Sequence, residues 1–143
     1  MSDLSPTDFL RDVFAHMEDD GQAILVAIND GGLRTFRCAS DLPDDATAGP
    51  LSCNQDADGS RYNLYWGAAS MDRELSPGSR GKEQNIVAIH AIVVDLDDPD
   101  AAAKYERNEF PLGYVPTYVI RTSGKRYQLV YKLNEPCTDL ADW

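Results

Sequence analysis

The sequence predicts an α+β fold in which a mixed or antiparallel central sheet is flanked by helices. Three observations support this prediction: a helical pattern of apolar residues near the N-terminus, several strand-like runs separated by turn residues, and a capped helix start after the longest run. With 143 residues, the chain has the length of one domain with one core. We therefore expect residues 1–143 to form a single domain.

The first predicted helix begins at Pro6. Ser5 is a good N-cap, Pro6 suits the first turn, and Asp8 stands at the spacing of a capping box. Apolar residues then recur at helical spacing and form one face, namely Phe9, Leu10, Val13, Phe14 and Met17. We expect this helix to end before Gly21.

A β-hairpin should follow the helix. Residues 23–28 and 33–38 are strand-like and flank Asn-Asp-Gly-Gly, whose residues tolerate positive φ. Residues 40–60 contain few apolar side chains and predict a long connection. A strand is then predicted at 61–66, and a second loop should run from there to Lys82.

The longest apolar run, residues 86–96, predicts a central strand buried on both faces. Asp98, followed by Pro99, is a good helix N-cap, so a short helix is predicted at 101–109. Two further strands, 117–121 and 127–133, should form a hairpin.

The central strand ends in closely spaced acids. Because side chains alternate along a strand, Asp95 and Asp97 should face one space while Leu96 points away. Two such anions repel each other, and a hard divalent cation with oxygen ligands would offset that repulsion. The pair therefore suggests a metal site, although the same acids could be a solvated turn, which we favour for Asp98 and Asp100.

Segments 80–98 and 120–130 together resemble the archaeo-eukaryotic primase superfamily, most closely the primase-polymerases of plasmids and phages. In that family an apolar strand ending Asp-apolar-Asp binds the metal ions, which corresponds to Asp95 and Asp97. The resemblance implies an RRM-like primase catalytic core with Mg²⁺ or Mn²⁺ as cofactor. It also implies nucleoside triphosphates as substrates and a single-stranded DNA template.

A second family motif, a Ser-Gly turn leading into a strand, contacts the triphosphate of the incoming nucleotide. It corresponds to Ser123, Lys125, Arg126 and Gln128 in this chain. The family usually has His where Gln128 stands, and often Gly where Arg126 stands. A glutamine can still donate hydrogen bonds to a phosphate oxygen, and the two cations can supply charge.

The third family motif, another metal-binding acid, has no match before Trp143. We therefore expect the chain to be an N-terminal fragment of a longer protein, with a helicase or another replication domain downstream. Arg80, Lys82 and Arg121 are candidates for nucleic-acid contact; for Arg80 and Lys82 a solvated linker is the alternative.

Composition excludes several other kinds of site. The chain has two histidines and three widely spaced cysteines, so neither a zinc site nor a Ser-His-Asp triad is predicted. No apolar run approaches the ~20 residues of a membrane span, and no secretory signal is present, so we expect a cytoplasmic protein without membrane contact.

The formal net charge of -11 argues against binding nucleic acid by bulk electrostatics. Two further hypotheses therefore stand beside a polymerase. One is a non-catalytic primase-fold module that binds nucleotide, nucleic acid or a protein partner. The other is an acidic protein that occupies the nucleic-acid site of another protein.

Overall fold

The computed structural model describes residues 4–29, 32–38, 63–75, 79–123 and 126–142. The chain forms two compact units: the first contains residues 1–90 and 135–143, and the second contains residues 91–134. Two long strands, β4 (Ile86–Leu96) and β6 (Arg126–Cys137), contribute residues to both units.

In the first unit, helix α1 (Pro6–Val13) begins at the predicted residue. The Ser5 side chain accepts a hydrogen bond from the Asp8 backbone N–H at 3.1 Å and so caps the helix. The helix ends before Gly21, as expected, with Phe14 as its C-cap. Its apolar face is buried, each side chain being at most 9% exposed: Phe9, Leu10, Val13 and Phe14.

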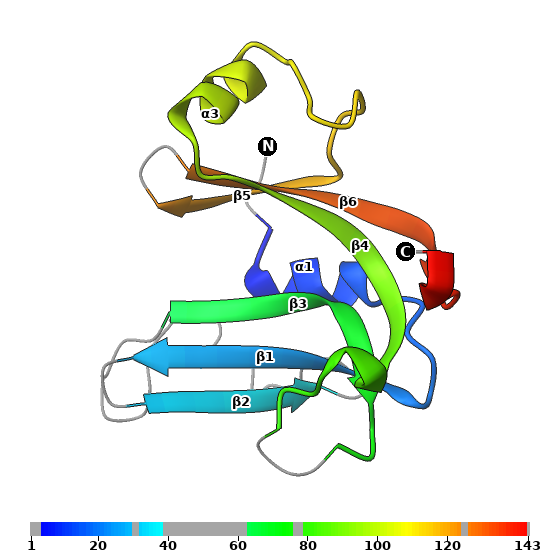
Figure 1. Cartoon of the computed structure of the whole chain (residues 1–143). Helices are drawn as coiled ribbons and strands as arrows, with labels where there is room; N and C mark the ends of the chain where they lie inside the picture. Colours follow the sequence, from blue (N-terminus) through cyan, green and yellow to red (C-terminus); the bar gives the residue numbers. More distant parts are fainter. Residues whose placement is uncertain (1–3, 30–31, 39–62, 76–78, 124–125, 143) are drawn as a thin grey trace. The chain divides into compact units, whose positions relative to one another are not determined.

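The strands of the first unit follow the order β2-β1-β3-β4 (Figure 1). β1 (Gly21–Asn29) and β2 (Gly32–Cys38) form the predicted antiparallel hairpin. β1 also pairs antiparallel with β3 (Asn63–Asp72), which in turn pairs antiparallel with the first part of β4.

Helix α1 packs on this sheet through aromatic rings. Phe9 meets Trp66 of β3 edge to face, with 5.0 Å between ring centroids, and the Phe14 ring lies 4.9 Å from the His90 ring of β4. Buried apolar side chains of β1 and β4 complete the core of the unit, namely Ala23, Ile24, Leu25, Val26, Ala88 and Ile89.

β3 is longer than the sequence predicts. A strand at 61–66 followed by a loop is expected, whereas the strand continues to Asp72; residues 61–62 lie outside the described residues. The extension contains small residues with little preference for strands. Pairing on both sides holds them nevertheless, since Ser70 pairs with Ala23 of β1 and with Ala88 of β4.

The second unit contains the end of β4, helix α3 (Pro99–Glu106), β5 (Tyr118–Ser123) and most of β6. β5 and β6 form the predicted antiparallel hairpin, and the strand order is β4-β6-β5. Figure 1 shows β4 and β5 running in the same direction, with β6 running the opposite way between them. This arrangement is a split β-α-β unit.

Helix α3 ends three residues earlier than the expected Glu109. Asn108 adopts a left-handed conformation (φ 62°), and the Glu109 N–H donates to the Lys104 carbonyl at 2.9 Å. A left-handed residue at this position terminates a helix, and asparagine is one of the few residues that adopts it readily. Asn108 is therefore a sequence signal for the end of the helix, and the predicted end at Glu109 does not take it into account.

The core of the second unit lies between α3 and one face of its strands. Leu96, Leu129 and Tyr131 form a buried cluster. Partly buried hydrophobic side chains pack against it, from α3 and from the strands: Ile92, Val94, Ala101, Tyr105 and Tyr127. The buried side of β4 in this unit therefore includes Leu96, as predicted.

The fold is α+β, as predicted, and the pairings β1–β2, β1–β3, β3–β4 and β5–β6 are antiparallel. The described residues form six strands and two α-helices. Among these residues, no helix combines the length and the apolar character that a bilayer-spanning helix requires.

Candidate functional site

The end of β4 separates its acids from the core. Leu96 is 3% exposed and belongs to the buried cluster beneath α3. Asp95 and Asp97 flank it in sequence and are both exposed. Strand alternation thus directs the Asp95 carboxylate away from α3, whereas Asp97 follows the last residue of the strand.

The next two acids form the start of α3. The Asp98 side chain accepts a hydrogen bond from the Asp100 backbone N–H at 3.1 Å and caps the helix, as predicted. Asp100 lies in the first turn, where a negative charge interacts favourably with the helix dipole. The position of these two acids is therefore explained by the start of the helix.

Gln128 makes direct contact with Asp95. Its Nε2 donates a hydrogen bond of 2.8 Å to Asp95 Oδ1, across 33 residues of sequence. β6 lies beside β4 in the sheet, and Gln128 alternates with Tyr127 and Leu129, which face the core. The contact therefore lies on the face opposite α3, where it links the residues of the two sequence motifs.

The end of β5 and the start of β6 lie close to Gln128 in sequence. Ser123 ends β5 and pairs in register with Arg126, the first residue of β6; the Ser123 side chain and all of Lys125 lie outside the described residues. Arg126 is exposed and is two residues from Gln128. By strand alternation Arg126 thus shares the face of Gln128 and Asp95.

Arg121 lies on the other face of the hairpin. It pairs in register with Tyr127, and directly paired residues of an antiparallel ladder point to the same side. Tyr127 packs against the core cluster beneath α3. The structure therefore does not bring Arg121 together with Asp95 and Gln128.

Arg80 and Lys82 belong to the first unit. Both are exposed and flank Gly81, whose φ is 80° and whose N–H donates to Ser79 Oγ at 3.1 Å. The Lys82 N–H donates to Asn85 Oδ1 at 2.9 Å, at the start of a short 3-10 helix. These residues thus form an ordered turn that presents two cations.

The carboxylates at the end of β4 suit a particular class of metal. The described ranges contain no cluster of three or more His, Cys, Asp or Glu residues that could hold an ion by themselves. Mg²⁺ is commonly bound through one or two carboxylates together with substrate phosphates and water. Asp95 and Asp97 provide two hard oxygen ligands of this kind, so the donor chemistry fits Mg²⁺ or Mn²⁺ shared with a triphosphate.

The sequence did not indicate a buried polar pair in the first unit. His90 Nε2 lies 3.0 Å from Ser70 Oγ, and both residues are at most 2% exposed. Ser70 Oγ donates to the Ala88 carbonyl at 3.4 Å, so its oxygen accepts from a neutral His90 that carries its proton on Nε2. A histidine within an apolar strand is itself a signal, because a buried polar group requires a partner.

This pair is a structural element of the core. Burial, with a smaller contribution from His16, lowers the pKa of His90 to about 4. The imidazole is therefore neutral at pH 7. Because neither side chain is accessible to a substrate, we assign the pair to stability and not to catalysis.

Comparisons with protein-family models, with curated proteins and with solved structures find no match for this chain. Function must therefore be inferred from the arrangement of the residues themselves.

Proposed function

We propose that the chain belongs to a metal-dependent nucleotidyltransferase of the DNA primase type, which joins nucleotides on a nucleic-acid template during replication of a plasmid, phage or mobile element. The observation that carries this proposal is the 2.8 Å hydrogen bond between Asp95 and Gln128. The two residues come from separate motifs in the resemblance to primases. Their contact supports a site that the two motifs share.

The topology of the second unit also supports the proposal. A β-α-β-β segment with strand order β4-β6-β5 corresponds to one half of an RRM-like or ferredoxin-like fold. In this half, α3 covers one face, and Asp95 and Gln128 lie on the other. The nucleotide would bind on the face that carries Asp95 and Gln128.

Charge is unevenly distributed along the second unit. Residues 95–109 contain six carboxylates and two cations, whereas residues 121–132 contain four cations and no carboxylate. A triphosphate carries several negative charges, which the basic hairpin would attract. The net charge of the whole chain therefore does not exclude an anionic substrate next to β6.

Asp95 and Asp97 would hold Mg²⁺ or Mn²⁺ through their carboxylate oxygens. Such ions neutralise charge on the transferring phosphoryl group and lower the pKa of the attacking hydroxyl. Gln128 donates a hydrogen bond to Asp95 and would hold that carboxylate in orientation. Ser123, Lys125 and Arg126 would complete the triphosphate contacts.

The test is template-directed nucleotide synthesis by the protein. Labelled nucleotide incorporation is measured on primed and unprimed single-stranded DNA, with Mg²⁺ or Mn²⁺, for the native protein and for the double variant Asp95→Asn/Asp97→Asn. We expect a rate loss of at least ~100-fold, because each carboxylate supports charge stabilisation in the transition state.

Asp19→Asn is the matched control, since Asp19 is exposed and lies in the first unit. It should leave the rate unchanged. Normal extension by the double variant would rule out the proposed catalytic carboxylates.

A second candidate is a non-catalytic primase-fold module that binds nucleotide, nucleic acid or a protein partner. It is favoured by the absence of a three-ligand cluster within the described residues. Calorimetry distinguishes the two candidates. Nucleoside triphosphate binding of equal strength with Mg²⁺ and with a chelator would support the module.

A further inference from the structure

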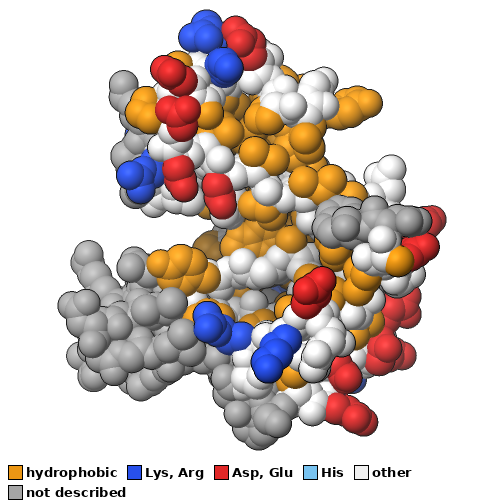
Figure 2. Space-filling view, viewed as in Figure 1, with side chains coloured by type: hydrophobic (Ala, Val, Ile, Leu, Met, Phe, Trp, Pro, Cys, Tyr) orange, Lys and Arg blue, Asp and Glu red, His pale blue; other side chains and the backbone are white. Residues whose placement is uncertain are grey.

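The segment between α3 and β5 exposes a run of large apolar side chains. In this segment Tyr114 is 74% exposed, Val115 is 76% exposed and Leu112 is 42% exposed. Figure 2 shows hydrophobic side chains gathered beside charged ones on this part of the unit. Single exposed apolar residues are normal, but a contiguous group suggests a contact surface.

The backbone of this segment is fixed by specific hydrogen bonds. Gly113 adopts φ 73°, and its N–H donates to the Phe110 carbonyl at 2.9 Å. Tyr131 Oη donates to the Tyr114 carbonyl at 3.1 Å, and the Thr117 N–H donates to the Val130 carbonyl at 2.8 Å. The apolar side chains are thus presented on an ordered backbone, which reduces the entropy lost on binding.

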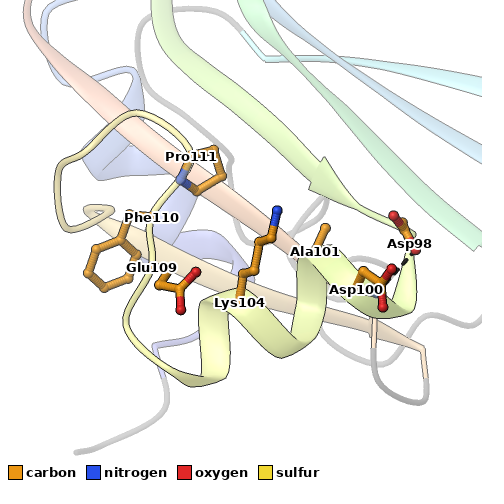
Figure 3. Close-up of a pocket in the computed structure, with 7 residues that line it drawn as sticks. All are labelled: Asp98, Asp100, Ala101, Lys104, Glu109, Phe110 and Pro111. Carbon is orange, nitrogen blue, oxygen red and sulfur yellow. Dashed lines mark hydrogen bonds between the residues drawn. The ribbon is translucent and has the colours of Figure 1, made fainter.

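A pocket of about 410 Å³ adjoins this segment. Its lining joins the start of α3 to the residues that precede the apolar run (Figure 3): Asp98, Asp100, Ala101, Lys104, Glu109, Phe110 and Pro111. Phe110 and Pro111 are directly followed in sequence by Leu112, so the pocket wall and the apolar run are continuous along the chain.

The pocket has an excess of carboxylates. Among the described residues that line it, Asp98, Asp100 and Glu109 are carboxylates and Lys104 is the one cation. Arg107 pairs with Glu109 at 3.1 Å, but both side chains are more than half exposed, so the pair is weak. A cationic side chain of a binding partner would therefore be favoured here.

We propose that this surface docks a segment of a partner protein in which a lysine or arginine stands beside apolar residues. The cation would enter the pocket, and the apolar residues would cover Tyr114 and Val115. Carboxylates disfavour a nucleic acid at the same place. A second copy of the chain, with its net charge of -11, would also be repelled.

The experiment selects binders from a displayed library of short random peptides, with the whole chain as bait. Enriched peptides are synthesised, and their affinity is measured by fluorescence anisotropy at two salt concentrations. We expect them to combine Lys or Arg with apolar residues and to bind more weakly at high salt. Binding of single-stranded oligothymidine tests a nucleic acid as the occupant of this surface. Sedimentation of the chain alone tests a second copy of the chain.

Two double variants locate the binding surface. Tyr114→Ser/Val115→Ser removes apolar area, and Asp100→Asn/Glu109→Gln removes negative charge; all four side chains are exposed, so the fold should persist. Each should weaken peptide affinity at least ~10-fold, as expected for central contacts of an interface. Tyr65→Ser in the first unit, also an exposed tyrosine (52%), should change it less than ~2-fold.

Three results would overturn the proposal. The first is a selection that enriches no peptides, or enriches peptides without a cation. The second is affinity that both double variants leave intact. The third is oligothymidine binding or self-association that Tyr114→Ser/Val115→Ser abolishes. None of these results bears on the Asp95–Gln128 site, because the proposal does not rest on the nucleotidyltransferase function.

Discussion

His90 illustrates, at the scale of one residue, how burial fixes a protonation state. The imidazole is 2% exposed, contacts Ser70 and Phe14, and has its pKa lowered to about 4. An unfolded histidine has a pKa near 6.5, so the unfolded chain binds more protons than the native chain between these two values. The contribution of His90 to stability is therefore complete above about pH 6.5 and is lost as the pH falls toward 4.

We predict that His90→Gln removes much of this pH dependence. The free energy of unfolding of the native chain should fall between pH 6.5 and pH 4 by about 2–3 kcal/mol more than that of the variant, as one pKa unit corresponds to ~1.4 kcal/mol. Urea unfolding at several pH values measures this free energy for both proteins. His16→Gln, at an exposed site, should retain most of the slope; equal slopes in native chain and His90→Gln would refute the assignment.

The Asp95–Gln128 contact makes a second prediction at this scale. Gln128→Glu would replace the donor with a carboxylate 2.8 Å from another carboxylate. We expect the melting temperature to fall at low ionic strength through like-charge repulsion, worth about 1 kcal/mol at an exposed site. Added Mg²⁺ should reverse the loss, because two adjacent carboxylates bind the ion more strongly.

Gln84→Glu provides the matched control, since Gln84 is exposed and lies in the first unit. It changes the charge by the same amount and should show no Mg²⁺-dependent recovery. If Gln128→Glu is as stable as the native chain without Mg²⁺, the two side chains do not meet in solution.

At the scale of the element, the sequence predicted the strands with strong local signals. β4 runs over the expected residues, because its β-branched side chains favour a strand and its acids mark the end. The end of β3 was missed, because residues 67–70 have no such preference and are held by pairing on both sides. Pairing between distant segments is not encoded in local sequence, so the end of a strand cannot always be predicted from that segment alone.

The loop after α3 allows a direct test of backbone conformation. An added Cβ at Gly113 would contact nothing within 4 Å, yet φ is 73° there, so Gly113→Ala should be destabilising by strain alone. We expect a loss of about 1 kcal/mol in the free energy of unfolding.

Gly67 is the matched position for this test. A Cβ there also meets nothing within 4 Å, and φ lies outside the left-handed region. Gly67→Ala should therefore be neutral or stabilising by up to ~1 kcal/mol, because glycine weakens a strand. If urea denaturation shows the same effect for both variants, the positive φ at Gly113 is not maintained in solution.

At the scale of the whole molecule, the sequence predicted the fold class but not the division of the chain into two compact units. One apolar run predicts one central strand, and β4 is that strand. The run does not reveal that residues before Ala91 join one compact unit and later residues another, because each half packs against segments distant in sequence. The expectation of a single core for 143 residues was based on length alone.

The candidate site was predicted in part. Strand alternation in β4 correctly directs Asp95 away from the buried Leu96, whereas Asp97 lies beyond the end of the strand. Alternation alone cannot join the two strands, since their proximity depends on β6 lying between β4 and β5. The sequence also did not predict the exposed apolar segment and its pocket. Backbone hydrogen bonds hold that segment in place, and no local sequence pattern indicates them.

The distribution of charge along the chain also affects which ligands the molecule can bind. Net charge alone would exclude an anionic substrate, yet the cations of residues 121–132 are separated in sequence from the carboxylates of residues 95–109. Because salt screens exposed charges beyond ~8–10 Å, local arrangement decides which ligand is favoured at each place. One acidic chain can therefore offer a site for a triphosphate and another for a basic peptide.

The most direct test of the central claim is the location of a paramagnetic ion. Mn²⁺ is titrated into the isotope-labelled chain with a nucleoside triphosphate, and the broadening of backbone amide signals is recorded by NMR. We predict selective broadening around Asp95, Asp97 and Gln128, abolished by Asp95→Asn/Asp97→Asn and retained by Asp19→Asn. Broadening that is absent there, or that persists unchanged in the double variant, would contradict a metal site at the end of β4.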